Sequence, residues 1–103
     1  MADDIILVAE DDPEDCAFIK EAFSAGQAQG CLRFVEDGEQ LLDYLRRRGE
    51  YADPQAAPPP SIVLLDLNMP RKDGREALRE IKSDPALRRI PVVVLTTSQA
   101  QED

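Results

Sequence analysis

The feature that most restricts how this chain can fold is a series of four short, almost continuously apolar runs. They cover residues 3–9, 31–36, 61–67 and 90–98, and the second is the weakest. Runs of this length, without a polar residue at every second position, are typical of strands buried on both faces of a parallel sheet. The run at 61–67 is the most apolar, so we expect it to form a central strand.

Helical patterns fill the intervals, over residues 13–26, 38–49 and 75–84. Residues 50–60 contain several prolines and are expected to form a surface loop. Arginines at 46–48 close the second helix, where cations complement the helix dipole, and we expect a solvated face there. The apolar residues that recur at helical spacing are Cys16, Ile19 and Phe23, then Leu41, Leu42 and Leu45, then Ala77, Leu78 and Ile81.

Strands that alternate with helices predict an α/β domain, in which helices cover both faces of an open parallel sheet through right-handed crossovers. The 103 residues suffice for one small domain. The formal net charge of −9 repels phosphate backbones and anionic lipid, which argues against a nucleic-acid or membrane surface. No apolar run approaches the roughly 20 residues of a membrane span. The acidic N-terminus is unlike a secretory signal, so we expect a cytoplasmic chain.

The residue types that are missing exclude further functions. The chain contains no histidine, which removes histidine-based triads and histidine metal sites. Its two cysteines, Cys16 and Cys31, fall at apolar positions of expected elements and do not form a C-x-x-C motif. We therefore expect buried free thiols rather than a disulfide or zinc ligands.

Polar side chains follow three of the four expected strands. In an open parallel α/β sheet, the functional crevice lies outside the carboxyl ends of the strands, and a flavodoxin-like order 2-1-3-4 places the first and third strands side by side. Their terminal carboxylates would then crowd one rim of the sheet. The polar residues at the strand ends are Glu10, Asp11 and Asp12, then Asp66 and Asn68, then Thr96 and Thr97.

Carboxylates crowded in this way indicate a cation site. Like charges at such separations are destabilising unless a cation joins them. Oxygen ligands without a nearby histidine or thiolate favour Mg²⁺, which binds a few carboxylates, waters and phosphate oxygens. A carboxylate beside Mg²⁺ can attack phosphorus and form an aspartyl phosphate. The sequence therefore predicts a site for Mg²⁺ and phosphate, in which Asp66 is the candidate nucleophile.

The same residues carry a resemblance to a known family. They are Glu10-Asp11 after the first strand, Asp66 with Met69-Pro70 and Asp73-Gly74 after the third, and Thr96 after the apolar segment 91–95. In this order, the chain resembles the receiver domain of bacterial two-component response regulators over essentially its whole length. The proline-containing segment and the stretch LLDLNMPRKDG are similar to stand-alone regulators paired with phytochrome-like kinases.

The resemblance implies a role for each matched acid. Asp66 would accept a phosphoryl group from a histidine kinase or a phosphotransfer protein, with Mg²⁺ as the cofactor. Asp11 would bind the metal directly, and Glu10 would act on it through water. Asp66 and the backbone carbonyl of Asn68 would complete the protein's metal ligands.

Two threonines match family positions at the carboxyl end of the fourth strand. By resemblance, Thr96 would be the switch hydroxyl that bonds the phosphate and reports its presence, and Thr97 would occupy the small position that controls access. Asp12 lies one residue beyond the matched acid pair and, like Glu14, is better explained by the preference of acids for helix N-termini. The chain would be a signalling switch first and a slow autophosphatase second, rather than an enzyme.

Two other functions remain open. A haloacid-dehalogenase-like Mg²⁺ phosphatase also uses a strand-end aspartate, but its general acid two residues later should be aspartate and is Asn68 here. A pseudo-receiver would serve only as an interaction module. The complete set of Glu10, Asp11, Asp66 and Thr96 argues against it.

The sequence stops at TTSQAQED, where Ser98 and Gln101 are spaced as a capping box. By resemblance, a helix, a fifth strand with a lysine that pairs with the aspartyl phosphate, and a last helix should follow. Neither Lys72 nor Lys82 matches that lysine. We therefore expect residues 1–103 to be a C-terminally incomplete receiver domain. Its fourth strand would be an open edge, so that the piece alone would be marginally folded and would aggregate or form a homodimer through that edge.

Overall fold

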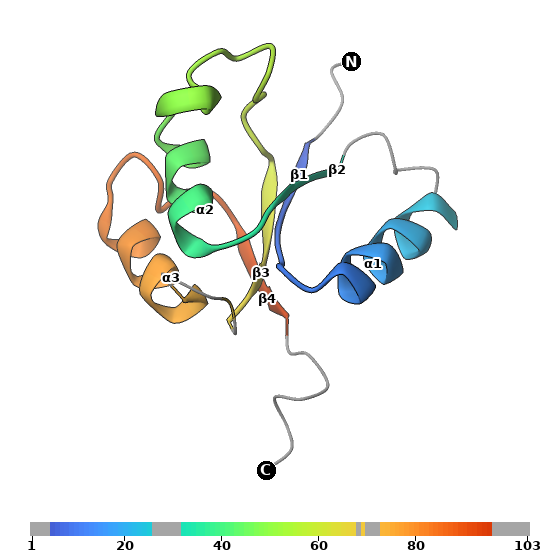
Figure 1. The fold of residues 1–103 in the computed structure, drawn as a ribbon. Helices are drawn as coiled ribbons and strands as arrows, with labels where there is room; N and C mark the ends of the chain where they lie inside the picture. Colours follow the sequence, from blue (N-terminus) through green and yellow to red (C-terminus); the bar gives the residue numbers. More distant parts are fainter. Residues whose placement is uncertain (1–4, 26–31, 68, 70–72, 96–103) are drawn as a thin grey trace.

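The computed structural model describes residues 5–25, 32–67, 69 and 73–95 of the chain. Its four strands are β1 (Ile6–Ala9), β2 (Leu32–Val35), β3 (Ile62–Asp66) and β4 (Val92–Leu95). Neighbouring strands are parallel, and their order is β2-β1-β3-β4 (Figure 1). The predicted flavodoxin-like order is therefore confirmed. Strand β3 lies between β1 and β4, as expected of the most apolar run.

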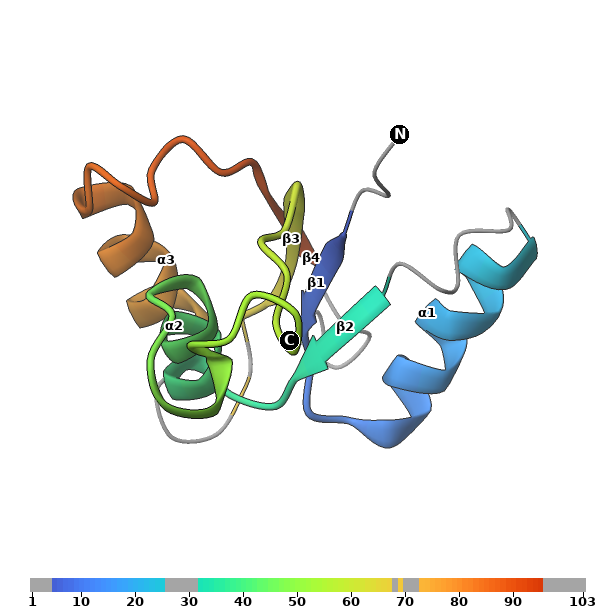
Figure 2. The ribbon, with the colours of Figure 1, turned by 90° about the horizontal axis from the view of Figure 1, so that it is seen from above.

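In the described part of the chain, three α-helices cover the sheet: α1 (Pro13–Ala25), α2 (Gly38–Leu45) and α3 (Gly74–Ser83). Figure 2 shows α1 on one side of the sheet and α2 with α3 on the other, which confirms the prediction of helices on both faces. Asp37 and Asp73 are the N-caps of α2 and α3, because their side chains accept hydrogen bonds from the backbone N–H groups of Gln40 and Glu76. No helix in the described ranges is long and apolar enough to cross a membrane.

The main hydrophobic core lies between the sheet and the pair of helices α2 and α3. The apolar faces predicted for the second and third helices are the faces that point into it. The proline-containing loop is fixed to the same core by buried Ala57 and by the Tyr44 hydroxyl, which donates a hydrogen bond to the carbonyl of Pro58 at 2.7 Å. Buried members of the core include Leu7, Ala9, Val63 and Leu65 of the sheet, and Leu41, Leu42, Leu45, Ala77 and Ile81 of the helices.

Helix α1 is less buried than the other two helices. Its predicted apolar face, formed by Cys16, Ile19 and Phe23, is only half-buried, and Phe18 is 70% exposed. Cys16 is a free thiol, as predicted, but the expectation that it is buried is wrong, because α1 covers the sheet with only part of its surface. Cys31 lies outside the described residues.

The second helix ends earlier than predicted, at Leu45 rather than Gly49. Arg47 adopts the left-handed backbone conformation, with a φ of 60°. This conformation terminates helices, and glycine is the residue that usually adopts it. Because the residue at this position is an arginine and not a glycine, the residue types do not indicate that the helix ends here. The short 3-10 helix η2 (Gly49–Tyr51) follows.

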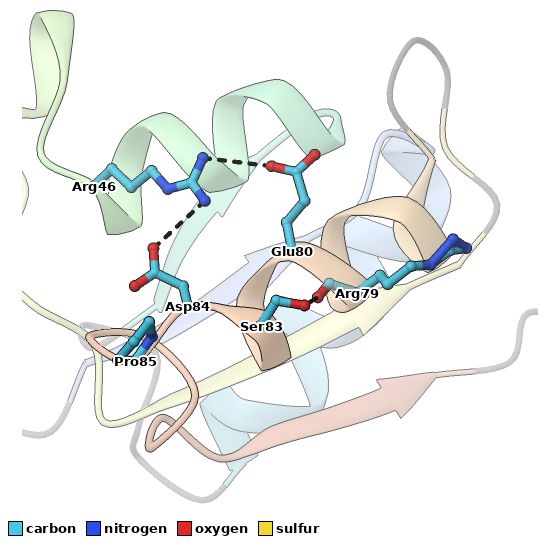
Figure 3. Close-up of a pocket in the computed structure, with 6 residues that line it drawn as sticks. All are labelled: Arg46, Arg79, Glu80, Ser83, Asp84 and Pro85. Atoms are coloured by element: carbon cyan, nitrogen blue, oxygen red, sulfur yellow. Dashed lines mark hydrogen bonds and ion pairs between the residues drawn. The ribbon is translucent and has the colours of Figure 1, made fainter.

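The prediction of a solvated arginine face is wrong for Arg46. Its guanidinium group forms ion pairs with Glu80 and Asp84, each at 3.4 Å, across a pocket between α2 and α3 (Figure 3). The paired side chains are partly exposed, so each pair contributes less than about 1 kcal/mol. Together the two pairs attach the C-terminal end of α3 to α2.

Replacing Arg47 with glycine is expected to stabilise the protein. The left-handed conformation costs an L-residue about 1 kcal/mol, and within the described part of the chain the terminal nitrogens of Arg47 are buried without a hydrogen-bond partner. We expect urea titration of the full-length protein to show a gain of about 1 kcal/mol in the free energy of unfolding for Arg47→Gly. Arg48→Gly, at a φ of −106°, is the matched control and should lose stability. A loss in Arg47→Gly would contradict the prediction.

Candidate functional site

Three carboxylates meet at the carboxyl edge of the sheet. Glu10 and Asp11 directly follow β1, and Asp66 is the last residue of β3. Since Ala9 pairs with Leu65 in the parallel ladder of β1 and β3, Glu10 and Asp66 lie one step further along neighbouring strands. The structure thus brings together the acids that the sequence places at these two strand ends.

Two of the three carboxylates are almost completely buried. Glu10 and Asp66 are each 2% exposed, whereas Asp11 is exposed. One carboxylate oxygen of each residue lies within 4.8 Å of the other two. The remaining buried acid in the described ranges is Asp37, which is explained as the N-cap of α2. Buried carboxylates this close repel one another unless a proton or a cation lies between them.

Oxygen atoms at this spacing fit a divalent cation. Mg²⁺ binds oxygen at about 2.1 Å, so two direct ligands lie at most about 4.2 Å apart, and a ligand that acts through water can lie farther away. The three donors are carboxylates, without nitrogen or sulfur, which is the donor set of Mg²⁺, Mn²⁺ and Ca²⁺ sites. The residues present therefore fit a hard divalent cation.

Burial dominates the electrostatics of Glu10. It raises the pKa of Glu10 from an ordinary 4.5 to about 7, against the hydrogen bond that the backbone N–H of Asp12 donates to the Glu10 side chain at 3.1 Å. The charge of Asp66 and a hydrogen bond with it raise the pKa further. A cation between the carboxylates of Glu10 and Asp66 would favour the charged form of Glu10 and lower its pKa.

Two further acids, Asp12 and Asp15, lie near the site at the N-terminal end of α1. The side chain of Asp12 accepts a hydrogen bond from the backbone N–H of Glu14 at 2.8 Å, which confirms that Asp12 serves the helix N-terminus. Asp15 was not a sequence candidate. Its pKa is raised by burial and then by the charges of Asp12 and Asp66. The signal that could have identified it is its position in the first turn of the predicted helix, directly after the acids that end the first strand.

Helix α3 begins directly against the end of β3. The backbone N–H of Gly74 donates a hydrogen bond to the carbonyl of Leu67 at 3.1 Å, and Met69 is buried in the core. Asp73 is the N-cap of the helix. Three residues of the matched motif, Met69, Asp73 and Gly74, therefore fix the turn that follows Asp66.

Three predicted site residues, Asn68, Thr96 and Thr97, lie outside the described residues, so their roles stay predictions. Leu95, which precedes Thr96, pairs with Asp66 in the ladder of β3 and β4. The carboxyl end of β4 is therefore next to Asp66. This is the edge at which the sequence predicts the polar residues of the fourth strand to act.

Comparisons with known proteins agree with this geometry. The pattern of the response regulator receiver domain matches residues 6–103. A curated relative, the response regulator Rcp1 of Synechocystis sp., is 43% identical over 99 residues, which are 96% of this chain and 65% of that protein. The chain thus spans less than two thirds of the length of this relative.

Two solved structures show the same fold at a clear sequence similarity. The phosphorylated cyanobacterial phytochrome response regulator RcpA superposes with a TM-score of 0.83 and 49% identity, over 93% of this chain and 66% of that chain. The Mn²⁺-bound form of Rcp1 superposes with a TM-score of 0.79 and 42% identity, over 97% of this chain and 70% of that chain.

Proposed function

Because this chain belongs to the response regulator receiver domain family, we propose that it is the phosphorylation-dependent switch of a two-component system, with Asp66 as the phosphoacceptor. The observation that carries the proposal is the buried carboxylate of Asp66 at the end of β3, with carboxylate oxygens of Glu10 and Asp11 within 4.8 Å. A strand-end carboxylate beside a cation site is suited to attack phosphorus.

The cation is proposed to be Mg²⁺. Asp11, Asp66 and the backbone carbonyl of Asn68 would hold it directly, and the deeper carboxylate of Glu10 would act through water. When bound, the ion would neutralise negative charge on the phosphoryl oxygens and on Asp66 during transfer. The donor set of the site and the Mn²⁺ in the structure of the relative Rcp1 both support a hard divalent cation.

The residues of the chain perform the transfer itself. An oxygen of Asp66 forms a bond to phosphorus, while the bond between phosphorus and the imidazole nitrogen of a phosphohistidine breaks and the imidazole leaves. The product is an aspartyl phosphate. Because Asp66 is 2% exposed, its phosphate would meet little bulk water, and slow hydrolysis would reset the switch.

The phosphate donor is proposed to be a histidine kinase of the phytochrome type, or a phosphotransfer protein that acts after it. The relative RcpA is described as a cyanobacterial phytochrome response regulator, which supports this choice. The chain would meet such a kinase in the cytoplasm. The net charge of −9 favours a partner with a basic surface around its phosphohistidine.

The experiment that tests the proposal offers a small phosphodonor to the full-length protein. Acetyl phosphate is added with Mg²⁺, and the phosphoryl group is located by peptide mass spectrometry. Incorporation of phosphate on Asp66 that does not occur when a chelator has removed the metal supports the proposal. No incorporation would favour a pseudo-receiver that serves only as an interaction module, and phosphate on another residue would show that the acceptor is misassigned.

Thr97 is proposed to control access to the phosphate. Thr96→Ala is expected to leave phosphorylation intact but to weaken the conformational response to it. A hydroxyl that donates to the phosphate contributes about 0.5–1.5 kcal/mol, which biases a two-state equilibrium without preventing the chemistry. The measurement is partner binding with and without phosphate. Ser83→Ala, which removes a hydroxyl bonded to the carbonyl of Arg79 on α3, is the control and should respond normally. An unchanged phosphate-dependent gain in Thr96→Ala would exclude this role.

A further inference from the structure

Gly74, the first residue of α3, leaves no room for a side chain. A Cβ atom at this position would overlap the carbonyl oxygen of Asp66 and would lie 2.5 Å from the Cα atom of Leu67. Both are backbone atoms, which cannot rotate away as the end of a long side chain can. The absence of a side chain therefore allows the backbone of α3 to lie against the peptide that joins Asp66 to Leu67.

Helix α3 has little freedom to move away from that peptide. Ala77 and Ile81 are completely buried in the core beneath it. At its other end, the two ion pairs of Arg46 attach the helix to α2 (Figure 3). By contrast, Asp66 is the last residue of β3, and the strand gives way to a turn at Leu67. Asp66 pairs with Leu95 as the last step of the described ladder between β3 and β4, so a side chain at position 74 would press on the final peptide of the strand.

We propose that Gly74 is a positioning residue for the phosphoacceptor: by admitting the α3 backbone, it sets where the Asp66 carboxylate lies relative to Glu10 and Asp11. The proposal rests on the proposed function of Asp66. The oxygens of the three carboxylates lie within 4.8 Å of one another, so a shift of the Asp66 backbone by a fraction of an ångström changes the fit to one ion.

The test compares two glycine-to-alanine variants of the full-length protein. Gly74→Ala is the test variant. Gly49→Ala is the matched control, because Gly49 has a φ of 59° and no atom within 4 Å of an added Cβ, so its cost is backbone strain outside the site. Both are measured in trimethylamine N-oxide, which favours folded states, at a concentration where circular dichroism shows the control to be fully folded.

Two readouts are taken, the affinity for Mn²⁺ alone and the rate of labelling by acetyl phosphate with Mg²⁺. We expect Gly74→Ala to be folded and to lose about tenfold or more in both, because small misplacements of reacting groups have effects of this size. Gly49→Ala should match the wild type within about twofold. If Gly74 served only stability, Gly74→Ala would lower the unfolding midpoint, as Gly49→Ala does. The Mn²⁺ affinity and the labelling rate of the folded protein would then be unchanged.

Every other result has a defined meaning. Values for Gly74→Ala within about twofold of the control overturn the proposal, and so does a Gly74→Ala protein that fails to fold where the control folds, since Gly74 would then serve stability. Wild-type protein that binds Mn²⁺ but is never labelled on Asp66 contradicts the proposed function instead. The Mn²⁺ affinities of the two variants still decide whether Gly74 positions the carboxylate.

Discussion

Asp66→Asn is expected to reduce phosphorylation by acetyl phosphate to the background of the assay, a loss of more than about 10³-fold. The amide has nearly the shape of the carboxylate, so the turn at the end of β3 and the contact with Gly74 should persist. What is lost is the anionic oxygen that attacks phosphorus. The measurement is the intact mass of the full-length protein after incubation with acetyl phosphate and Mg²⁺.

Two variants show whether this loss is specific. Asp84→Asn removes an acid at the far end of α3 that pairs with Arg46, and it should be labelled at the wild-type rate. Asp11→Asn keeps the acceptor but removes the exposed carboxylate of the site, so it should bind Mg²⁺ more weakly and be labelled more slowly. If Asp66→Asn still gains one phosphoryl group at the wild-type rate, Asp66 is not the acceptor.

Glu10→Gln is expected to stabilise the metal-free protein above neutral pH and to have much less effect at pH 5. Burial raises the pKa of Glu10 to about 7 in the folded state, from an ordinary 4.5. Below the lower value, Glu10 is protonated in both the folded and the unfolded state. As the pH rises from 4.5 to about 7, the unfolded chain releases this proton first, so the free energy of unfolding falls. At about 1.4 kcal/mol per pKa unit, the difference between 4.5 and about 7 amounts to a loss of about 3–4 kcal/mol.

The measurement is urea unfolding of the wild type and Glu10→Gln at pH 5 and pH 8 in the presence of a chelator. The gain from the substitution should be larger at pH 8 by about 2 kcal/mol. Glu14→Gln, on the exposed first turn of α1, is the control and should show no such difference. In wild-type protein, added Mg²⁺ should restore stability most strongly at the higher pH, because it takes the place of the proton. If Glu10→Gln raised the free energy of unfolding equally at both pH values, the pKa of Glu10 would not be raised in the folded protein.

The sheet and the acids of the site could be predicted from the sequence because both depend on local patterns. Strands buried on both faces must be apolar throughout, so a carboxylate such as Asp66 at the end of such a run stands out. Parallel strands then bring their carboxyl ends to one edge, and the flavodoxin-like strand order, which sets β1 beside β3, places Glu10 beside Asp66. The family resemblance supplied the distinct roles of these acids, which spacing alone does not give.

The features that could not be predicted depend on contacts between distant residues or on an unusual backbone conformation. Arg46 looked solvated because its partners Glu80 and Asp84 lie on another helix. The sequence does not indicate the end of α2, because Arg47 adopts a left-handed conformation that is usually found at glycine. The Asp-Gly pair before α3 was recognised as a motif, but the contact of Gly74 with Asp66 becomes visible only in three dimensions.

The origin of the site in two separate strands also bears on how the protein is made. Glu10 and Asp11 leave the ribosome long before Asp66 does, and two adjacent acids on an unfolded chain offer a hydrated divalent cation few ligands. The ion is therefore not expected to guide the early folding of β1, α1 and β2. It can be captured only after β3 has been inserted beside β1, a pairing that closes a long loop and is correspondingly slow. Once captured, the ion would retard the reopening of that pair, so its main effect falls on the lifetime of the folded domain rather than on the speed at which it forms.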